Sequence, residues 1–157
     1  RGLVGSEMCI RDRDVTEALR DAALTAQVRH VAAAPRARER LVAMQRAFAE
    51  RCERVVTEGR DQGTVAFPDA DAKFYLTAQP AERARRRAAE MAGNGGAPDV
   101  ARIERALVDR DRSDEGRAVG PLKPAEDAIR LDTTDLSVEE VVEEVCRRVE
   151  ERCSRKR

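Results

Sequence analysis

Residues 54–87, RVVTEGRDQGTVAFPDADAKFYLTAQPAERARRR, decide the fold class, because the pattern changes from strand to loop and back to strand within a few residues. Residues 55–57 form a β-branched run that predicts a strand, and Gly59 and Gly63 mark the loop behind it. Residues 72–78 predict a second strand. The helical pattern that follows favours parallel βα units in an open α/β sheet.

The sequence on both sides extends this pattern. Apolar periodicity predicts four further helices, at residues 22–35, 36–53, 80–91 and 99–112. Residues 128–134 predict a third strand. A last helix begins after Ser137, which forms a capping box with Glu140 ahead of a valine stripe. Cys146 and Cys153 share that helical face, and we expect both to be buried as small apolar residues.

Composition indicates one soluble domain of ordinary size. The chain has 157 residues, 41% of them apolar, with thirty basic and thirty acidic side chains and only 3% aromatic residues. Balanced charge gives little attraction to nucleic acid or to an anionic membrane, so we expect neither partner. The sequence has no apolar run long enough to span a bilayer, no CxxC pair and no metal-binding motif, and we expect a reduced, cytoplasmic protein.

Two charged segments are candidates for chemistry. Glu58, Arg60 and Asp61 follow the first predicted strand, where ligands bind in open α/β sheets. Residues 110–117 alternate arginines with carboxylates. By composition alone, this second segment is better explained as a solvated, self-paired charge run. The alternative is a clamp in which arginines bind phosphate and a carboxylate binds ribose hydroxyls.

Two long motifs together carry a family resemblance. EGRDQGTVAFPDADAKFYLTAQPAERARRR (58–87) and VDRDRSDEGRAVGPLKPAEDAIRLDTTDLSVEEVVEEV (108–145) closely resemble cytidylate kinase of the bacterial type, as do residues 14–20 and 34–49. The resemblance implies a three-layer P-loop kinase fold with a parallel sheet. It also implies transfer of the γ-phosphate of ATP, with Mg²⁺, to CMP or dCMP by a monomeric enzyme.

The resemblance also implies roles for individual residues. Arg38 and Asp61 match the pair that reads the cytosine ring. Arg60, Arg110 and Arg117 match the arginines at the phosphates, which we expect to be the catalytic residues. Arg110 and Asp114 match the positions that hold the nucleotide sugar. In the lid, Arg86 or Arg87 would close over the ATP phosphates.

The chain departs from the family pattern at two places. Arg29 stands where the family has a serine on the base-reading helix, and its neighbour His30 has no role in the family. More importantly, the sequence contains no Gly-x-x-x-x-Gly-Lys-Ser/Thr, the P-loop that cradles ATP phosphates. Without the P-loop strand and the early front segment, strand edges and apolar faces lose their partners. We therefore expect this polypeptide alone to be poorly folded and not to turn over ATP.

The resemblance suggests the following division of the chain: a non-native leader (1–13), the late monophosphate-binding region and a helix (14–52), core strands and nucleotide loop (53–81), the lid region with flanking helices (82–117), and a C-terminal core strand and helix (118–157).

Three classes of function stay open: a cytidylate kinase fragment, a CMP-binding remnant without catalysis, and an arginine-rich nucleic-acid binder. Within the first class, another nucleoside monophosphate kinase is the alternative.

Overall fold

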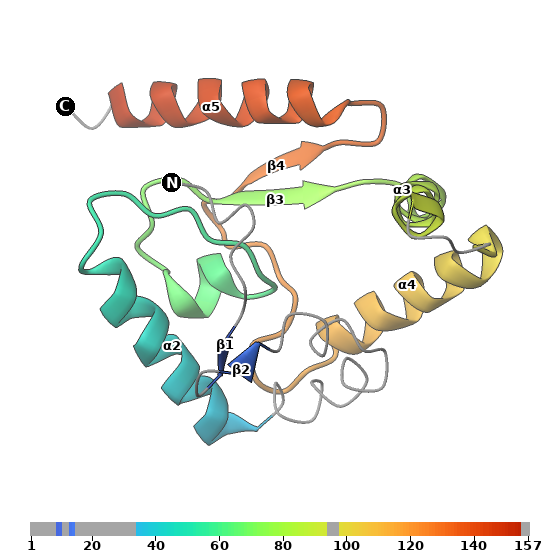
Figure 1. Ribbon diagram of the computed structural model, residues 1–157. Helices are drawn as coiled ribbons and strands as arrows, with labels where there is room; N and C mark the ends of the chain where they lie inside the picture. The colour runs from blue at the N-terminus through green and yellow to red at the C-terminus, as the bar shows by residue number, and fades with distance from the viewer. Residues whose placement is uncertain (1–8, 11–12, 15–33, 94–97, 155–157) are drawn as a thin grey trace. The chain divides into compact units, whose positions relative to one another are not determined.

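The structure, a computed structural model, describes residues 9–10, 13–14, 34–93 and 98–154 (Figure 1). The chain divides into two compact units, Arg1–Met44 and Gln45–Arg157, and each is described by itself. The boundary falls inside helix α2 (Pro35–Ala49).

The first unit contains a short antiparallel pair, β1 (Cys9–Ile10) and β2 (Arg13–Asp14), with Cys9 opposite Asp14. It also contains the first part of α2, whose first residue is Pro35. Proline suits a first helical position, because its missing N–H would have no partner there. The predicted helix before Pro35, with Arg29 and His30, lies outside the described residues, and the leader at residues 1–13 stays a prediction.

The centre of the second unit is a parallel pair of strands, β3 (Phe74–Thr77) and β4 (Ile129–Asp132), which lie side by side in Figure 1. Phe74 is opposite Ile129, and Thr77 is opposite Asp132. Parallel strands need a crossover connection, and here it carries helices α3 (Pro80–Gly93) and α4 (Val100–Glu115), which pack against each other. This arrangement confirms the predicted strands at 72–78 and 128–134 and the α/β class.

The helix ends follow local chemistry. Asp99 caps α4 by accepting a hydrogen bond from the Arg102 N–H at 3.0 Å. The last helix, α5 (Val138–Ser154), begins with the predicted capping box. Its two hydrogen bonds run from the Glu140 N–H to Ser137 Oγ at 3.2 Å and from the Ser137 N–H to Glu140 Oε2 at 2.8 Å.

The prediction of a strand at residues 55–57 is wrong. This segment has no regular secondary structure, and Val56 is fully exposed. Within the described ranges β3 pairs only with β4, so no third strand stands in that sheet for residues 55–57 to join. β-Branched residues form a strand when a neighbour supplies ladder hydrogen bonds and a packed face, and alone they do not. A five-residue π-helical turn, η2 (Gln62–Ala66), follows this segment instead.

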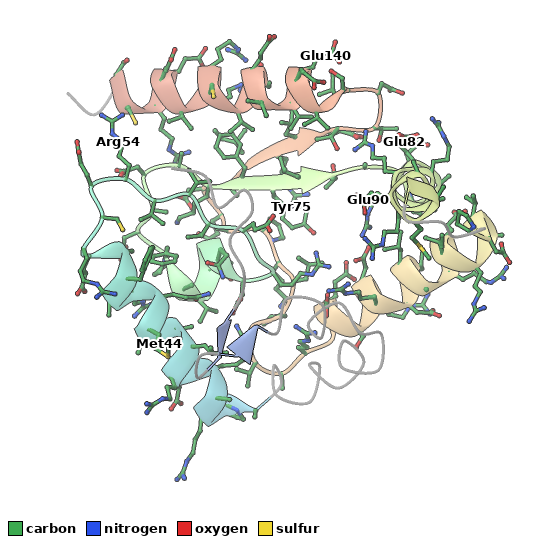
Figure 2. All side chains as sticks on the ribbon, in the orientation of Figure 1. Met44, Arg54, Tyr75, Glu82, Glu90 and Glu140 are labelled. Atoms are coloured by element: carbon green, nitrogen blue, oxygen red, sulfur yellow. The ribbon has the colours of Figure 1, made fainter. Side chains whose placement is uncertain are left out.

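The apolar core of the described residues is small. Its buried apolar side chains are Ala66, Ala84 and Ala88, whereas Leu76 on β3 is 54% exposed and Val138 on α5 is 75% exposed. The expectation of uncovered apolar faces is therefore confirmed. In addition to the backbone ladder, a cation–π contact joins the two strands: the Arg130 guanidinium on β4 lies 5.8 Å from the ring centroid of Tyr75, which is labelled in Figure 2.

Helix α5 differs from expectation in one respect. Cys146 and Cys153 are both exposed, so the expectation that they would be buried is wrong. Within the valine stripe, the partly buried residues are Val141, Val145 and Val149. Across the described parts of the chain, no helix is long and apolar enough to cross a membrane.

Candidate functional site

A buried carboxylate with three arginines forms the main polar cluster of the second unit. Asp114, in the last turn of α4, is 2% exposed. Its Oδ2 accepts a hydrogen bond from Arg60 Nε at 2.9 Å and lies 3.9 Å from Arg110 Nε, and its Oδ1 pairs with Arg117 Nη2. We call these four residues the Asp114 cluster. The structure thus brings together four of the residues that the sequence predicted to bind substrate.

The Asp114 cluster is suited to an anionic ligand. Three guanidinium groups and one carboxylate leave a formal excess of two positive charges. The side chains of Arg110 and Arg60 are 62% and 38% exposed, so donors outside the ion pairs are open to solvent. Guanidinium forks match the geometry of phosphate oxygens.

The loop that carries Arg60 and Asp61 is fixed by backbone bonds. The Asp61 carbonyl accepts hydrogen bonds from the N–H groups of Val65 and Ala66, at 2.9 and 3.2 Å, as η2 turns back on itself. Arg46, from the end of α2 in the same unit, donates to the carbonyls of Ala66 and Val65 at 2.7 and 2.8 Å. Asp61 is buried at 6% exposure, at the start of this braced turn.

The carboxylates of the 110–117 segment divide into two kinds. Asp114 belongs to the cluster, whereas Asp111 pairs through both oxygens with Arg83 of α3, with Nη2 to Oδ1 at 3.2 Å. The hydrogen bonds that Arg83 donates to this carboxylate raise the pKa of Arg83. The Arg83–Asp111 pair therefore joins α3 to α4 and helps to fix the helix that carries Arg110 and Asp114.

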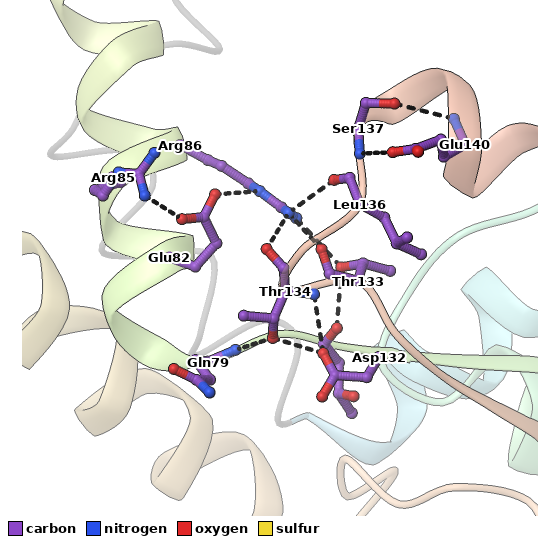
Figure 3. Close-up of polar contacts among 11 residues, drawn as sticks. Gln79, Glu82, Arg85, Arg86, Asp132, Thr133, Thr134, Leu136, Ser137 and Glu140 are labelled. Carbon is purple, nitrogen blue, oxygen red and sulfur yellow. Dashed lines mark hydrogen bonds and ion pairs between the residues drawn. The ribbon is translucent and has the colours of Figure 1, made fainter.

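Arg86 is held in a network at the carboxyl end of β4 (Figure 3). Its five hydrogen bonds go to Glu82 Oε1, to Thr133 Oγ1 and to the carbonyls of Thr133, Thr134 and Leu136. Hydrogen bonds from Thr134 to Asp132 Oδ1 lower the pKa of that carboxyl in the same turn. Arg87, by contrast, is 60% exposed and pairs with Glu90 at 2.7 Å.

The cytosine-reading pair from the sequence falls on the two units, with Arg38 in the first and Asp61 in the second. Arg38 is half-buried in the first turns of α2. The pairing of these two side chains at the cytosine ring stays a prediction.

Sequence reasoning missed Lys73. This lysine, just before β3, is 9% exposed, and its Nζ donates to the Pro68 carbonyl and to Asp127 Oδ1, the latter at 2.8 Å. The hydrogen bond from Lys73 lowers the pKa of the Asp127 carboxyl. A signal existed in the composition, because Lys73 is one of three lysines among thirty basic residues.

Among the described residues, no group of three or more histidines, cysteines or carboxylates could hold a metal ion. The side chains that surround Asp114 are guanidinium groups, which repel a cation. The described residues therefore do not fit Mg²⁺.

Comparison with known proteins identifies the family. The family model described as cytidylate kinase matches residues 3–151. The chain belongs to the cytidylate kinase family. It is 45% identical over 148 residues to a cytidylate kinase of Stutzerimonas stutzeri, covering 94% of this chain and 64% of that protein. It is 47% identical over 140 residues to a cytidylate kinase of Rhodopirellula baltica, covering 89% of this chain and 61% of that protein.

A third relative places the cytidylate kinase sequence in a longer protein. The bifunctional pantoate ligase/cytidylate kinase of Synechococcus elongatus is 46% identical over 141 residues, which are 90% of this chain and 27% of that protein. The chain spans 64% and 61% of the two single-function relatives named above. Cytidylate kinases are nucleoside monophosphate kinases, a class of phosphotransferase. The family implies the P-loop kinase fold, with which the parallel β3–β4 pair and its helices are consistent.

Proposed function

We propose that this chain supplies the monophosphate-binding part of a cytidylate kinase, which transfers the γ-phosphate of ATP to CMP or dCMP and yields CDP or dCDP. The observation that carries the proposal is the Asp114 cluster, an arginine-rich site with excess positive charge around a buried acid. Family membership supplies the nucleotide class.

In this proposal, Arg60, Arg110 and Arg117 neutralise the phosphate oxygens. Phosphoryl transfer depends on positioning and charge stabilisation more than on covalent help from the protein. Arginines already oriented by Asp114 supply that stabilisation with little reorganisation at the moment of reaction. Asp114 and Arg110 would also hold the sugar hydroxyls.

Asp61 and Arg38 would read the cytosine. A carboxylate accepts a hydrogen bond from the exocyclic amine of cytosine, whereas uracil carries a carbonyl oxygen there and would be repelled. The burial of Asp61 supports this role, because a desolvated carboxylate discriminates strongly between a donor and an acceptor.

Of the two lid candidates, the hydrogen bonds favour Arg87. Arg86 would have to give up a network of five hydrogen bonds to reach a phosphate. Arg87 would give up only its exposed ion pair with Glu90, and such a pair contributes little to stability.

For the 157-residue chain by itself, we propose CMP binding without turnover of ATP, because its sequence has no P-loop motif. ATP is the phosphate donor of the whole enzyme, and Mg²⁺ would accompany that nucleotide. We also propose a cytoplasmic monomer, supported by the resemblance, with no nucleic-acid or membrane partner, supported by the balanced charge. Light scattering coupled to size exclusion tests the monomer, and filter binding at low and physiological salt tests nucleic-acid binding.

Calorimetric titration of the chain with CMP tests the main proposal. Arg117→Gln removes one arginine of the Asp114 cluster, and Arg112→Gln removes an exposed arginine from the same region of α4 as a matched control. A lost charge-assisted phosphate contact is worth about 1.5–3 kcal/mol, so Arg117→Gln should weaken CMP binding roughly tenfold to a hundredfold. Arg112→Gln should leave it unchanged. No detectable binding of CMP at millimolar concentration would exclude the proposal.

The same titration with UMP and AMP tests the alternative of another nucleoside monophosphate kinase. Binding of CMP in clear preference to both supports the cytidylate type. Equal or tighter binding of AMP or UMP would favour the alternative.

A further inference from the structure

Lys73 has an environment that surface lysines lack. Its side chain is 8% exposed, and its ammonium group forms an ion pair with Asp127 and a hydrogen bond to the Pro68 carbonyl. Burying an ammonium group is costly unless it is paired and hydrogen-bonded, and here both conditions are met. An apolar side chain at this position would fill the space without that cost, so the charge itself has a use.

Two chain segments meet at Lys73, and the same two segments meet at Asp114. The first segment runs from Arg60 to Pro68 and the second from Arg117 to Asp127. At one end, Arg60 and Arg117 both bind Asp114. At the other end, the Pro68 carbonyl and the Asp127 carboxylate both accept hydrogen bonds from Lys73.

Contacts along both segments restrain them between these ends. A Cβ at Gly63 would lie 3.3 Å from Cδ of Lys73, so the lysine stem packs directly beneath η2. In the second segment, the Leu122 N–H donates to the Asp114 carbonyl at 2.9 Å. From α5, Arg152 donates hydrogen bonds to the Asp127 carbonyl at 3.1 Å and to Asp127 Oδ2 at 3.2 Å.

We infer that Lys73 and Asp127 are positioning residues for the monophosphate site: by clamping the far ends of the two segments, they hold Arg60 and Arg117 at their places around Asp114. The inference rests on the proposed function, since the positioned arginines are those assigned to the phosphate. Neither Lys73 nor Asp127 contacts the substrate in this scheme. Their effect on binding passes through the two arginines.

The test compares variants of the whole chain in two readouts. Lys73→Met keeps the stem under Gly63 and removes the ammonium group, and Asp127→Asn keeps the shape and removes the charge. Lys123→Met, an exposed lysine of the second segment, is the matched control. The first readout is the CMP dissociation constant by calorimetry. The second is the NMR signal of the Arg60 Nε–H, the group that bonds Asp114.

We expect Lys73→Met and Asp127→Asn to weaken CMP binding by about threefold to thirtyfold, as for other residues that act through a network. Both should also shift or broaden the Arg60 Nε–H signal without CMP, whereas the backbone amide of Glu140 in the α5 capping box should stay unchanged. Lys73→Arg should recover part of the affinity. Lys123→Met should match the parent chain.

Each remaining outcome decides the inference. If Lys73→Met does not fold, Asp127→Asn decides, because that side chain is 45% exposed and its substitution leaves no buried cavity. An unchanged Arg60 Nε–H signal, or lower stability with CMP affinity within about twofold of the parent chain, overturns the positioning role. If the parent chain does not bind CMP, the proposed function fails, and the Arg60 signal still tests whether Lys73 positions that arginine.

Discussion

Asp114→Asn should lower the free energy of unfolding of the chain by about 2 kcal/mol. Arg117, 20% exposed, is the least solvated partner, and a hydrogen bond between charged groups contributes about 1.5 kcal/mol there. Arg60 is 38% exposed, so its pair contributes about 0.5 kcal/mol. Arg110 is 62% exposed and 3.9 Å away, and its contribution is about zero.

Urea denaturation followed by far-UV circular dichroism measures the effect. A change of about 2 kcal/mol moves the urea midpoint by about 1 M for a chain of this size. Trimethylamine N-oxide in all samples strengthens burial and secures a folded baseline for a chain with so small an apolar core. Arg112→Gln serves as the control and should shift the midpoint little. An Asp114→Asn chain as stable as the parent, or more so, would refute the reasoning, because the desolvation of Asp114 would then outweigh its ion pairs.

Three further predictions concern the helices. Ser137→Ala should cost about 1 kcal/mol of stability through loss of the α5 cap, measured by the same denaturation. Arg147 and Arg148 lower the pKa of Glu144 to about 2 from an ordinary 4.5, so their stabilising effect is present above pH 4.5 and is lost as the pH falls toward 2; Glu144→Gln should flatten the acid unfolding curve in that window, and an unchanged curve would contradict the assignment. Arg83→Gln should loosen α3 from α4 and raise amide hydrogen exchange in both helices; unaltered exchange would show that apolar packing alone joins them.

Much of the secondary structure could be predicted from local sequence signals. The Ser137 capping box and the strand patterns at 72–78 and 128–134 are short-range features, and the structure confirms all three. The strand at 55–57 was a wrong prediction because a β-branched run shows propensity but not pairing. Whether Val56 stands in a sheet depends on a neighbour distant in sequence, and none stands beside it in the described residues.

The candidate site could also be predicted only in part. The run at 110–117 indicated an arginine-rich binding segment, and Arg110 and Asp114 do lie together. The two carboxylates of that run differ in their partners: Asp111 pairs with Arg83 of α3, whereas Asp114 pairs with arginines of the run and with Arg60. Binding of phosphate and ribose by this run stays a prediction. No periodicity distinguishes the two acids, since the difference comes from α3 and from the segment that carries Arg60.

Lys73 could not be found by motif. Its partner Asp127 is 54 residues away in the chain, and each residue alone is ordinary in its local context. The exposure of Cys146 and Cys153 was mispredicted for a similar reason. An apolar stripe shows which side of a helix can be buried, but the amount of neighbouring structure decides how much of it is covered.

The sharing of Asp114 among three arginines makes mutational tolerance at this site unequal. A substitution at any one arginine leaves two guanidinium groups near the acid, and under the proposed function it weakens one phosphate contact. A substitution at Asp114 leaves three like charges without their common counterion. Under the proposed function, drift at the arginines would therefore alter phosphate affinity step by step, whereas a change at Asp114 would disturb all three arginines at once.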